Sequence, residues 1–390
     1  MSVDALRGFD MFWLIGGEEL ARTLDQVGGG VVVKTLASQV QHAKWVGFHF
    51  YDVIFPLFLF LVGVSIVLSM DRTRIVGKRK SALGRIARRG ALLFALGIFC
   101  SGGVSRPWPD VELTGVLQRI ALCYLAGALL HLFLPRKGIV ITAAICLVGY
   151  WAMMTFVPFP DVNLKHPTVG RKETEESAKT SKELFSGAAM VRGTYDEGRN
   201  FANYVDARAL PGAKSNLYYT NEGLLSTIPA VATTLFGLMA GWVLTDAGAS
   251  HRRKVVWLVG AGAAGIVLGC LWGLEFPIIK RIWTSSFCLV ASGVSAVMLG
   301  GFYLVVDVWR WQRWCVPLLW IGTNSLLLYV VSELVDFEDI ATRLVGGDVD
   351  DLFDHWVAPG FGEFVIAVIG LLIPLLLVRF LYQRKIFIRI

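Results

Sequence analysis

Apolar runs of about 20 residues recur along the whole chain, and they constrain its fold more than any other feature. A bilayer core offers no water to the backbone, so only α-helices and closed barrels span it. A spanning helix needs roughly 20 apolar residues, and these runs are continuous instead of alternating, which excludes a barrel. With 55% hydrophobic and 17% charged residues, the chain has too few charges to cover a soluble surface. We expect an all-α, polytopic integral membrane bundle that forms a single domain over 1–390.

Ten segments are candidates for membrane-spanning helices, at about 5–22, 53–71, 87–104, 114–134, 138–157, 224–245, 254–274, 283–306, 315–335 and 362–383. Lys and Arg gather in alternate connections, at 72–89, 136–137, 252–254, 310–313 and 379–389. Basic loops stay in the cytoplasm, so the pattern predicts that both termini are cytoplasmic. Loops at about 158–223 and 336–361 then lie outside, and the inner (plasma) membrane is the expected location.

The net charge and the cysteine content limit the partners and cofactors that we expect. The net charge of +7 is accounted for by the topological clusters, so we expect a lipid bilayer and no nucleic acid as partner. The six cysteines have no paired spacing, which favours small apolar roles over disulfides or a zinc site, and no metal is expected. The first apolar run carries Asp4, Arg7 and Asp10, which argues against a cleavable signal peptide.

The first span is unusually polar. Asp4 and Arg7 stand at i,i+3 on one helical face, where they can pair, and Glu18 closes the outer end. Charged groups inside a bilayer are costly, so they face the protein interior and often mark function. Two interpretations stay open: a structural ion pair in a central helix, or the lining of a polar site.

A segment before the second span holds His42, Trp45, His49 and Asp52. An imidazole takes up a proton near neutral pH, and a carboxylate orients it. His42 and Asp52 are therefore candidates for a catalytic base and its partner. The alternative is a set of bland interfacial residues in an aromatic belt.

Later spans begin with, or contain, five further polar residues: Gln118, Arg119, Glu222, Asn324 and Ser325. Glu222 is also explained by the preference of carboxylates for helix starts. Arg119 is also explained by snorkelling to the interface, and the Asn324–Ser325 pair by interhelical hydrogen bonds. Together these residues predict a polar lining in the outer half of the bundle.

Five ordered blocks resemble the heparan-α-glucosaminide N-acetyltransferase family, within the transmembrane acyltransferases. They are Ser2-Val3-Asp4-Ala5-Leu6-Arg7-Gly8-Phe9-Asp10, then His42-x-x-Trp45-x-Gly47 with Asp52-x-x-Phe55-Pro56, then Gly115-Val116-Leu117-Gln118-Arg119, Glu222-Gly223-Leu224-Leu225-Ser226-Thr227 and Asn324-Ser325. One departure is Thr220-Asn221, where relatives carry Asp-Pro before Glu-Gly. The animal enzymes have an extra N-terminal span and a lumenal domain, so the resemblance implies a compact bacterial form.

The resemblance implies transfer of an acetyl group from cytoplasmic acetyl-CoA to an amino sugar or glycan acceptor on the far side. The family's active-site histidine falls on His42, and a polar residue at the outer end of the first span falls on Glu18. His42 then acts as a general base or as a transient acetyl-imidazole, with Arg119 or Asn324 as candidates for oxyanion stabilisation.

Other readings of the polar lining stay open at this stage. A transporter or flippase for a sugar-linked substrate uses the same lining without covalent chemistry. The absence of a convincing internal repeat counts against it, and so does a histidine segment at one face instead of the midplane. A third possibility is a structural or assembly subunit, but such a protein would have no use for the polar His, Asp and Arg residues. The acceptor and the oligomeric state, including a homodimer, are left open by the sequence.

Overall fold

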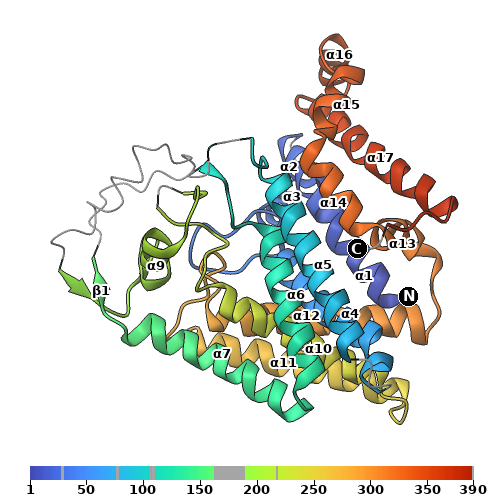
Figure 1. The fold of residues 1–390 in the computed structure, drawn as a ribbon. Helices are drawn as coiled ribbons and strands as arrows, with labels where there is room; N and C mark the ends of the chain where they lie inside the picture. Colours follow the sequence, from blue (N-terminus) through green and yellow to red (C-terminus); the bar gives the residue numbers. More distant parts are fainter. Residues whose placement is uncertain are drawn as a thin grey trace.

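The structure, a computed structural model, describes residues 1–27, 30–75, 79–105, 107, 110–161, 189–216 and 218–388 (Figure 1). The all-α membrane fold is confirmed. Among the described residues, seven helical segments are long and apolar enough to cross a membrane, and a bent pair is an eighth candidate. The seven are η2 and α4 (Phe50–Val53, Ile54–Ile75), α6 (Val116–Phe133), α7 (Arg136–Phe156), α10 (Thr227–Thr245), α11 (His251–Trp272), α12 with η4 (Ser285–Phe302, Tyr303–Val308), and α17 (Phe361–Gln383).

The bent pair occupies the ninth expected span. It consists of α13 (Val316–Thr323), preceded by η5 (Arg313–Cys315), and α14 (Ser325–Leu334), with 65° between the two helices. The break falls at Asn324. Its side chain donates to the backbone oxygen of Ile386 at 3.1 Å and accepts from the backbone nitrogen of Ile388 at 3.0 Å. The C-terminal segment is thereby tied to the bend.

Two further expected spans are helical but carry more charge. The first is α1 (Ser2–Phe12), η1 (Trp13–Gly17) and α2 (Glu18–Gln26), with a kink at Gly16, where φ is 152°. The other is α5 (Arg79–Cys100). Helix α1 crosses α13 at close range, because a Cβ placed on Gly8 would lie 1.8 Å from the Leu318 oxygen. Small residues allow this approach between membrane helices.

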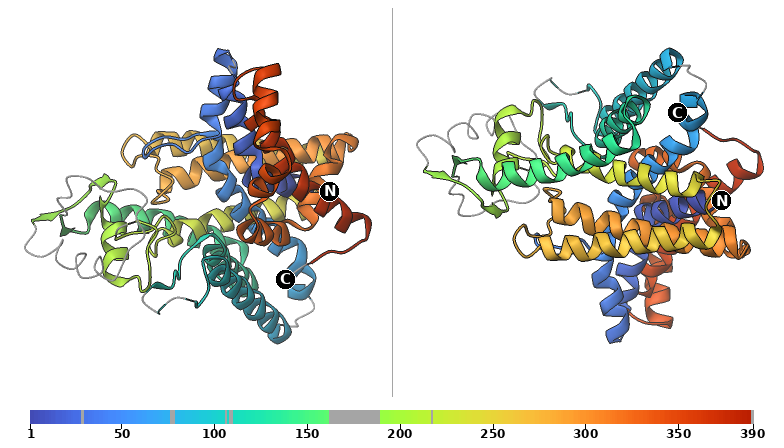
Figure 2. Two further views of the ribbon diagram at one scale, coloured as in Figure 1. Left: turned by 90° about the horizontal axis from the view of Figure 1, so that it is seen from above. Right: turned by 90° about the horizontal axis from the view of Figure 1, so that it is seen from below.

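Helix α4 forms the centre of the bundle and packs against α10, α6, α12 and α1. Its apolar residues surround the whole helix, which is the pattern of a buried element, and Leu57, Leu61 and Val64 are fully buried. Figure 2 shows two helix pairs beside this centre, α5 with α6 and α11 with α12.

The described residues of the connection at 158–223 form two short strand pairs and a helix. Strand β1 (Phe159–Pro160) pairs antiparallel with β2 (Met190–Val191), and β3 (Tyr195–Asp196) pairs with β4 (Arg199–Asn200). Helix α9 (Phe201–Ala209) follows, with the Asn200 side chain capping it at the backbone nitrogen of Asn203. The polar run Lys172–Glu183 lies outside the described residues. We call residues 189–216 and 218–223 the α9 lobe.

Two other connections contain helices that the sequence did not predict. The acidic connection 336–361 holds α15 (Phe337–Val345) and α16 (Asp348–Trp356). Asp336 caps α15 by accepting from two backbone N–H groups, a standard helix start. Helix α3 (Val31–Gln39) precedes the His42 segment. The α9 lobe lies at one end of the bundle and the N terminus toward the other (Figure 1).

Candidate functional site

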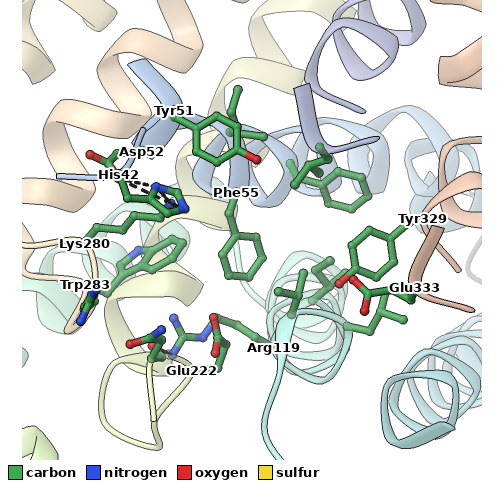
Figure 3. Close-up of a pocket in the computed structure, with 18 of the residues that line it drawn as sticks. His42, Tyr51, Asp52, Phe55, Arg119, Glu222, Lys280, Trp283, Tyr329 and Glu333 are labelled. Atoms are coloured by element: carbon green, nitrogen blue, oxygen red, sulfur yellow. Dashed lines mark hydrogen bonds and ion pairs between the residues drawn. The ribbon is translucent and has the colours of Figure 1, made fainter. Parts of the chain in front are cut away.

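A cavity of about 380 Å³ opens between α4, α6, α14 and the turn that joins α11 to α12. We call it the His42 cavity (Figure 3). Aromatic rings form much of its wall, among them Phe55, Trp283 and Tyr329. Its ionisable wall residues are His42, Tyr51, Asp52, Arg119, Glu222, Lys280, Arg281, Tyr329 and Glu333. Buried sites of this kind, with few polar groups among apolar ones, are the usual places for ligand binding.

His42 and Asp52 form a hydrogen-bonded pair in this wall. The Nδ1 atom of His42 lies 2.9 Å from Oδ1 of Asp52. An ionised carboxylate only accepts, so Nδ1 carries the proton and the lone pair of the ring lies on Nε2. Asp52 is fully buried, whereas the His42 side chain is 49% exposed. This arrangement leaves Nε2 as a base or nucleophile.

Backbone contacts hold Asp52 in place. Its Oδ2 atom accepts from the backbone nitrogens of His49 at 2.9 Å and Ala43 at 3.3 Å. The carboxylate therefore ties the strand-like segment before η2 to the start of the helix. The same segment is fixed to the α11–α12 turn, since Gly47 donates to the Ile278 oxygen at 3.0 Å. Trp45 donates from Nε1 to the Tyr195 oxygen of the α9 lobe.

Lys280 lies beside this pair. Its Nζ atom is 3.0 Å from Nδ1 and 3.3 Å from Nε2 of His42, and 3.6 Å from Oδ1 of Asp52. Burial lowers the pKa of Lys280 to about 8, against the opposing effect of the Asp52 charge. Figure 3 shows the lysine reaching along the wall to the imidazole.

Arg119 and Glu222 form a second polar group in the wall. One Nη2 atom of Arg119 donates to the backbone oxygens of Asn221 and Gly223 and to the Ser226 hydroxyl. Its guanidinium carbon lies 5.1 Å from the centre of the Trp283 ring. The Nε and Nη1 atoms are buried and have no hydrogen-bond partner in the described part of the chain. These N–H groups are available to a ligand oxygen.

The turn that holds Arg119 is itself supported by Asp206 of α9. Asp206 is buried and accepts from the backbone nitrogen of Leu224 at 2.9 Å. Burial raises its pKa to about 6. A Cβ on Gly223 would lie 2.1 Å from an Asp206 oxygen, so the turn and the carboxyl group pack without spare space.

A second cavity of about 590 Å³ adjoins the first. We call it the Arg7 cavity. Asp4, Arg7, Arg89 and Ser325 are among its wall residues. Arg7 pairs with Asp4 at 3.1 Å and donates to the Ser65 hydroxyl at 2.8 Å, which confirms the expected i,i+3 pair. Three residues, Phe58, Ile120 and Leu326, line both cavities.

The structure distributes the predicted site residues over several places. His42, Trp45, Asp52, Arg119 and Glu222 share the first cavity. Asp4, Arg7 and Ser325 lie in the second.

The other three predicted residues line neither cavity in the described structure. Glu18 contacts the Tyr51 hydroxyl, and the Tyr51 ring centre is 4.7 Å from that of His42. Gln118 is buried against Gly97 of α5. Asn324 holds the C-terminal segment instead of facing His42.

Sequence reasoning missed Lys280, Trp283, Tyr329 and Glu333, all of which line the His42 cavity. For Lys280 there was a signal. The pair Lys280-Arg281 stands in a connection that the predicted topology puts on the face opposite the basic clusters, where the positive-inside rule does not explain a lysine.

These features define a polytopic helical membrane protein with a His–Asp–Lys cluster in the wall of a buried cavity. Residues 1–173 match the family model described as "Heparan-alpha-glucosaminide N-acetyltransferase, catalytic". The heparan-alpha-glucosaminide N-acetyltransferases of Homo sapiens and Mus musculus are each 28% identical to the chain over 345 residues, covering 76% of this chain and 49% of each relative. The chain thus spans about half the length of the curated relatives it matches. The chain is therefore similar to this family, in agreement with the resemblance carried by its motifs.

Proposed function

We propose that the protein is a transmembrane acetyltransferase that moves an acetyl group from cytoplasmic acetyl-CoA to a glucosaminide-type amino sugar on the extracytoplasmic side. One observation carries the proposal: the His42–Asp52 pair faces a cavity that shares three wall residues with a second, arginine-containing cavity. The similarity to two heparan-alpha-glucosaminide N-acetyltransferases supports the reaction class.

The Arg7 cavity suits the donor. Arg7 and Arg89 bring two guanidinium groups to its wall, and guanidinium is the side chain best matched to phosphate oxygens. Arg85 and Arg88 lie on the same helix as Arg89. The pantetheine arm then passes Phe58, Ile120 and Leu326, which bring no charge, and places the thioester near His42.

The chemistry follows from the lone pair on Nε2 of His42. As the acceptor nitrogen bonds to the thioester carbon, Nε2 takes a proton from that nitrogen and the carbonyl π electrons move onto oxygen. Collapse of the tetrahedral intermediate re-forms the C=O bond and breaks the C–S bond. The sulfur leaves with the electron pair and receives the proton from His42, so N-acetyl sugar and CoA result. Asp52 holds the imidazole in the required tautomer and stabilises the imidazolium.

A two-step route uses the same residues. In it, Nε2 attacks the thioester carbon, CoA leaves, and the acceptor amine then takes the acetyl group from the imidazole. A burst of CoA in the absence of acceptor, stoichiometric with protein, is the expected sign of this route. Direct transfer predicts no burst.

The acceptor side is rich in carboxylates and rings. Glu222 and Glu333 face the His42 cavity with Trp45, Trp283 and Tyr329. Carboxylates attract an amine, and flat aromatic faces pack against apolar faces of sugar rings.

Proteoliposomes with a single protein orientation test the proposal as a whole. Acetyl-CoA supplied on the side of the Arg79–Arg89 cluster, with a methyl glucosaminide on the other side, should give N-acetylated sugar. Supplying both on the α9-lobe side should give none. Transport of the unmodified sugar without acetylation would refute the enzyme and favour a carrier.

A further inference from the structure

We propose that Lys280 is a catalytic residue whose ammonium group stabilises the negative charge on the acetyl carbonyl oxygen in the tetrahedral intermediate. This inference rests on the proposed acetyl transfer. It assigns a role to a residue that no sequence motif singled out.

The position of Lys280 relative to the reacting atom carries the argument. Nζ lies 3.3 Å from Nε2 of His42, the atom that takes the proton or the acetyl group. The carbonyl carbon must come within bonding range of the acceptor or of Nε2, so its oxygen falls within reach of the same ammonium. Stabilisers of acyl transfer act where negative charge develops.

The contacts of Lys280 are not those of a simple structural ion pair. Nδ1 of His42 already donates to Asp52, so it has no lone pair for a lysine N–H. Asp52 is 3.6 Å away from Nζ, and its oxygens accept from two backbone nitrogens and from His42. The lone pair on Nε2 of His42, 3.3 Å from Nζ, meets one lysine N–H in the resting site. The ammonium has three N–H bonds, so donor capacity remains for a carbonyl oxygen in the cavity.

The charge balance favours the same role. Before reaction, Lys280 and Asp52 carry opposite charges and His42 is neutral. Proton transfer creates an imidazolium within about 3 Å of a second cation, an unfavourable pair by itself. The oxyanion forms at the same moment, and its charge offsets the repulsion between the two cations.

The backbone that presents Lys280 is tightly constrained. Val46 and Ile279 form an isolated bridge, and the Ile279 nitrogen donates to the Thr284 hydroxyl at 3.1 Å. The backbone nitrogen of Trp283 donates to the backbone oxygen of Lys280 at 2.9 Å, and Trp283 adopts a positive φ of 51°. A bulky residue in this conformation is strained, and such strain concentrates at functional sites. The turn therefore fixes the backbone from which the Lys280 side chain extends.

A pH dependence follows. Lys280 is charged below its pKa of about 8 and neutral above it, so its contribution to rate is lost as the pH rises through 8. The charged and titratable groups that face it are His42 and Asp52, with Tyr51, Glu18 and Glu222 farther off.

The test compares Lys280→Met and Lys280→Arg with wild type in the purified full chain, using acetyl-CoA and methyl glucosaminide. Lys44→Met is the matched control, since Lys44 is exposed and outside the cavity wall. At pH 7, Lys280→Met should lower kcat about 10²–10³-fold, with KM for acetyl-CoA within about threefold. Lys280→Arg should recover at least tenfold over Met, because arginine keeps the charge.

The pH profile separates catalysis from structure. The ratio of wild-type to Lys280→Met rates should fall about tenfold between pH 7 and 9, because the charged fraction of Lys280 falls by that factor around a pKa of about 8. The ratio of Lys280→Arg to Lys280→Met should stay constant. A constant wild-type ratio, or a Lys280→Met rate within about threefold of wild type at pH 7, would overturn the inference. If Lys280→Met does not fold, the wild-type to Lys280→Arg ratio must still fall above pH 8. A wild type without acetyl transfer would instead reject the proposed function itself.

Discussion

Replacement of Asp52 by Asn separates orientation of the imidazole from its chemistry. In wild type, one oxygen of Asp52 accepts from two backbone N–H groups and the other from Nδ1 of His42. An Asn side chain has one oxygen, and the two backbone donors claim it. Its NH₂ group then faces Nδ1, which must become an acceptor, so the proton moves to Nε2. The base is thereby blocked.

The expected loss is large while folding is kept. A buried aspartate that sets a catalytic histidine tautomer is worth about 10⁴ in kcat, so we expect Asp52→Asn to lower kcat 10³–10⁴-fold by this comparison. Both backbone donors keep a partner, so thermal stability in detergent should change little. Asp52→Ala is the contrast, because it leaves those donors unsatisfied at about 1–3 kcal/mol each.

The assay is CoA release with a methyl glucosaminide acceptor, alongside acetyl-CoA binding. Binding should survive, because the nucleotide end is expected in the other cavity. An Asp52→Asn protein that retained more than about a tenth of wild-type kcat, far above the loss expected for a wrong tautomer, would refute the reasoning about the His42 tautomer.

Three further perturbations address other parts of the account. Arg89→Ala should raise KM for acetyl-CoA about tenfold by loss of a charge-assisted contact, with kcat unchanged; an unchanged KM at low salt would remove Arg89 from the donor site. Burial raises the pKa of Asp206 to about 6 in the folded protein. The free energy of unfolding should therefore fall as the pH rises from about 4 to 6, by at most about 3 kcal/mol. Asp206→Asn should flatten this dependence in thermal unfolding, and a slope equal to that of wild type would contradict the burial argument. In a cysteine-free background, Met190→Cys should react with an impermeant maleimide outside intact cells and Ser250→Cys should not; the reverse would invert the topology.

The sequence predicted the chemical groups of the site better than it predicted their geometry. His42 and Asp52 are ten residues apart, and their pairing follows from a short segment that turns back at η2. Lys280 comes from a turn 238 residues away, and one sequence gives no way to join two such distant segments. In the sequence, Lys280 stands out only because it lies outside the connections in which the other basic residues cluster.

Other differences have local physical causes. For Asn324 the sequence left open interhelical hydrogen bonds or a place in the polar lining. In the structure it stands at a 65° break and binds the C-terminal backbone. The acidic run 336–361 read as a loop, yet Asp336 starts a helix there. In both cases a polar residue satisfies backbone groups at a helix end, which composition alone does not distinguish from a solvated loop. The all-α membrane class needed only the long apolar runs, and it is confirmed.

The central claim is that His42 performs the acetyl transfer, and one comparison of kcat tests it most directly. His42→Ala and His49→Ala are matched, since both lie on the same segment but only His42 faces the cavity; the His49 ring instead contacts the Gln41 oxygen. His42→Ala should bind acetyl-CoA normally and lose about 10²–10⁴-fold in turnover of a glucosaminide, while His49→Ala keeps most of it. A His42→Ala protein that kept more than about a tenth of wild-type turnover would contradict the account, because that is well above the residual activity expected after loss of a base.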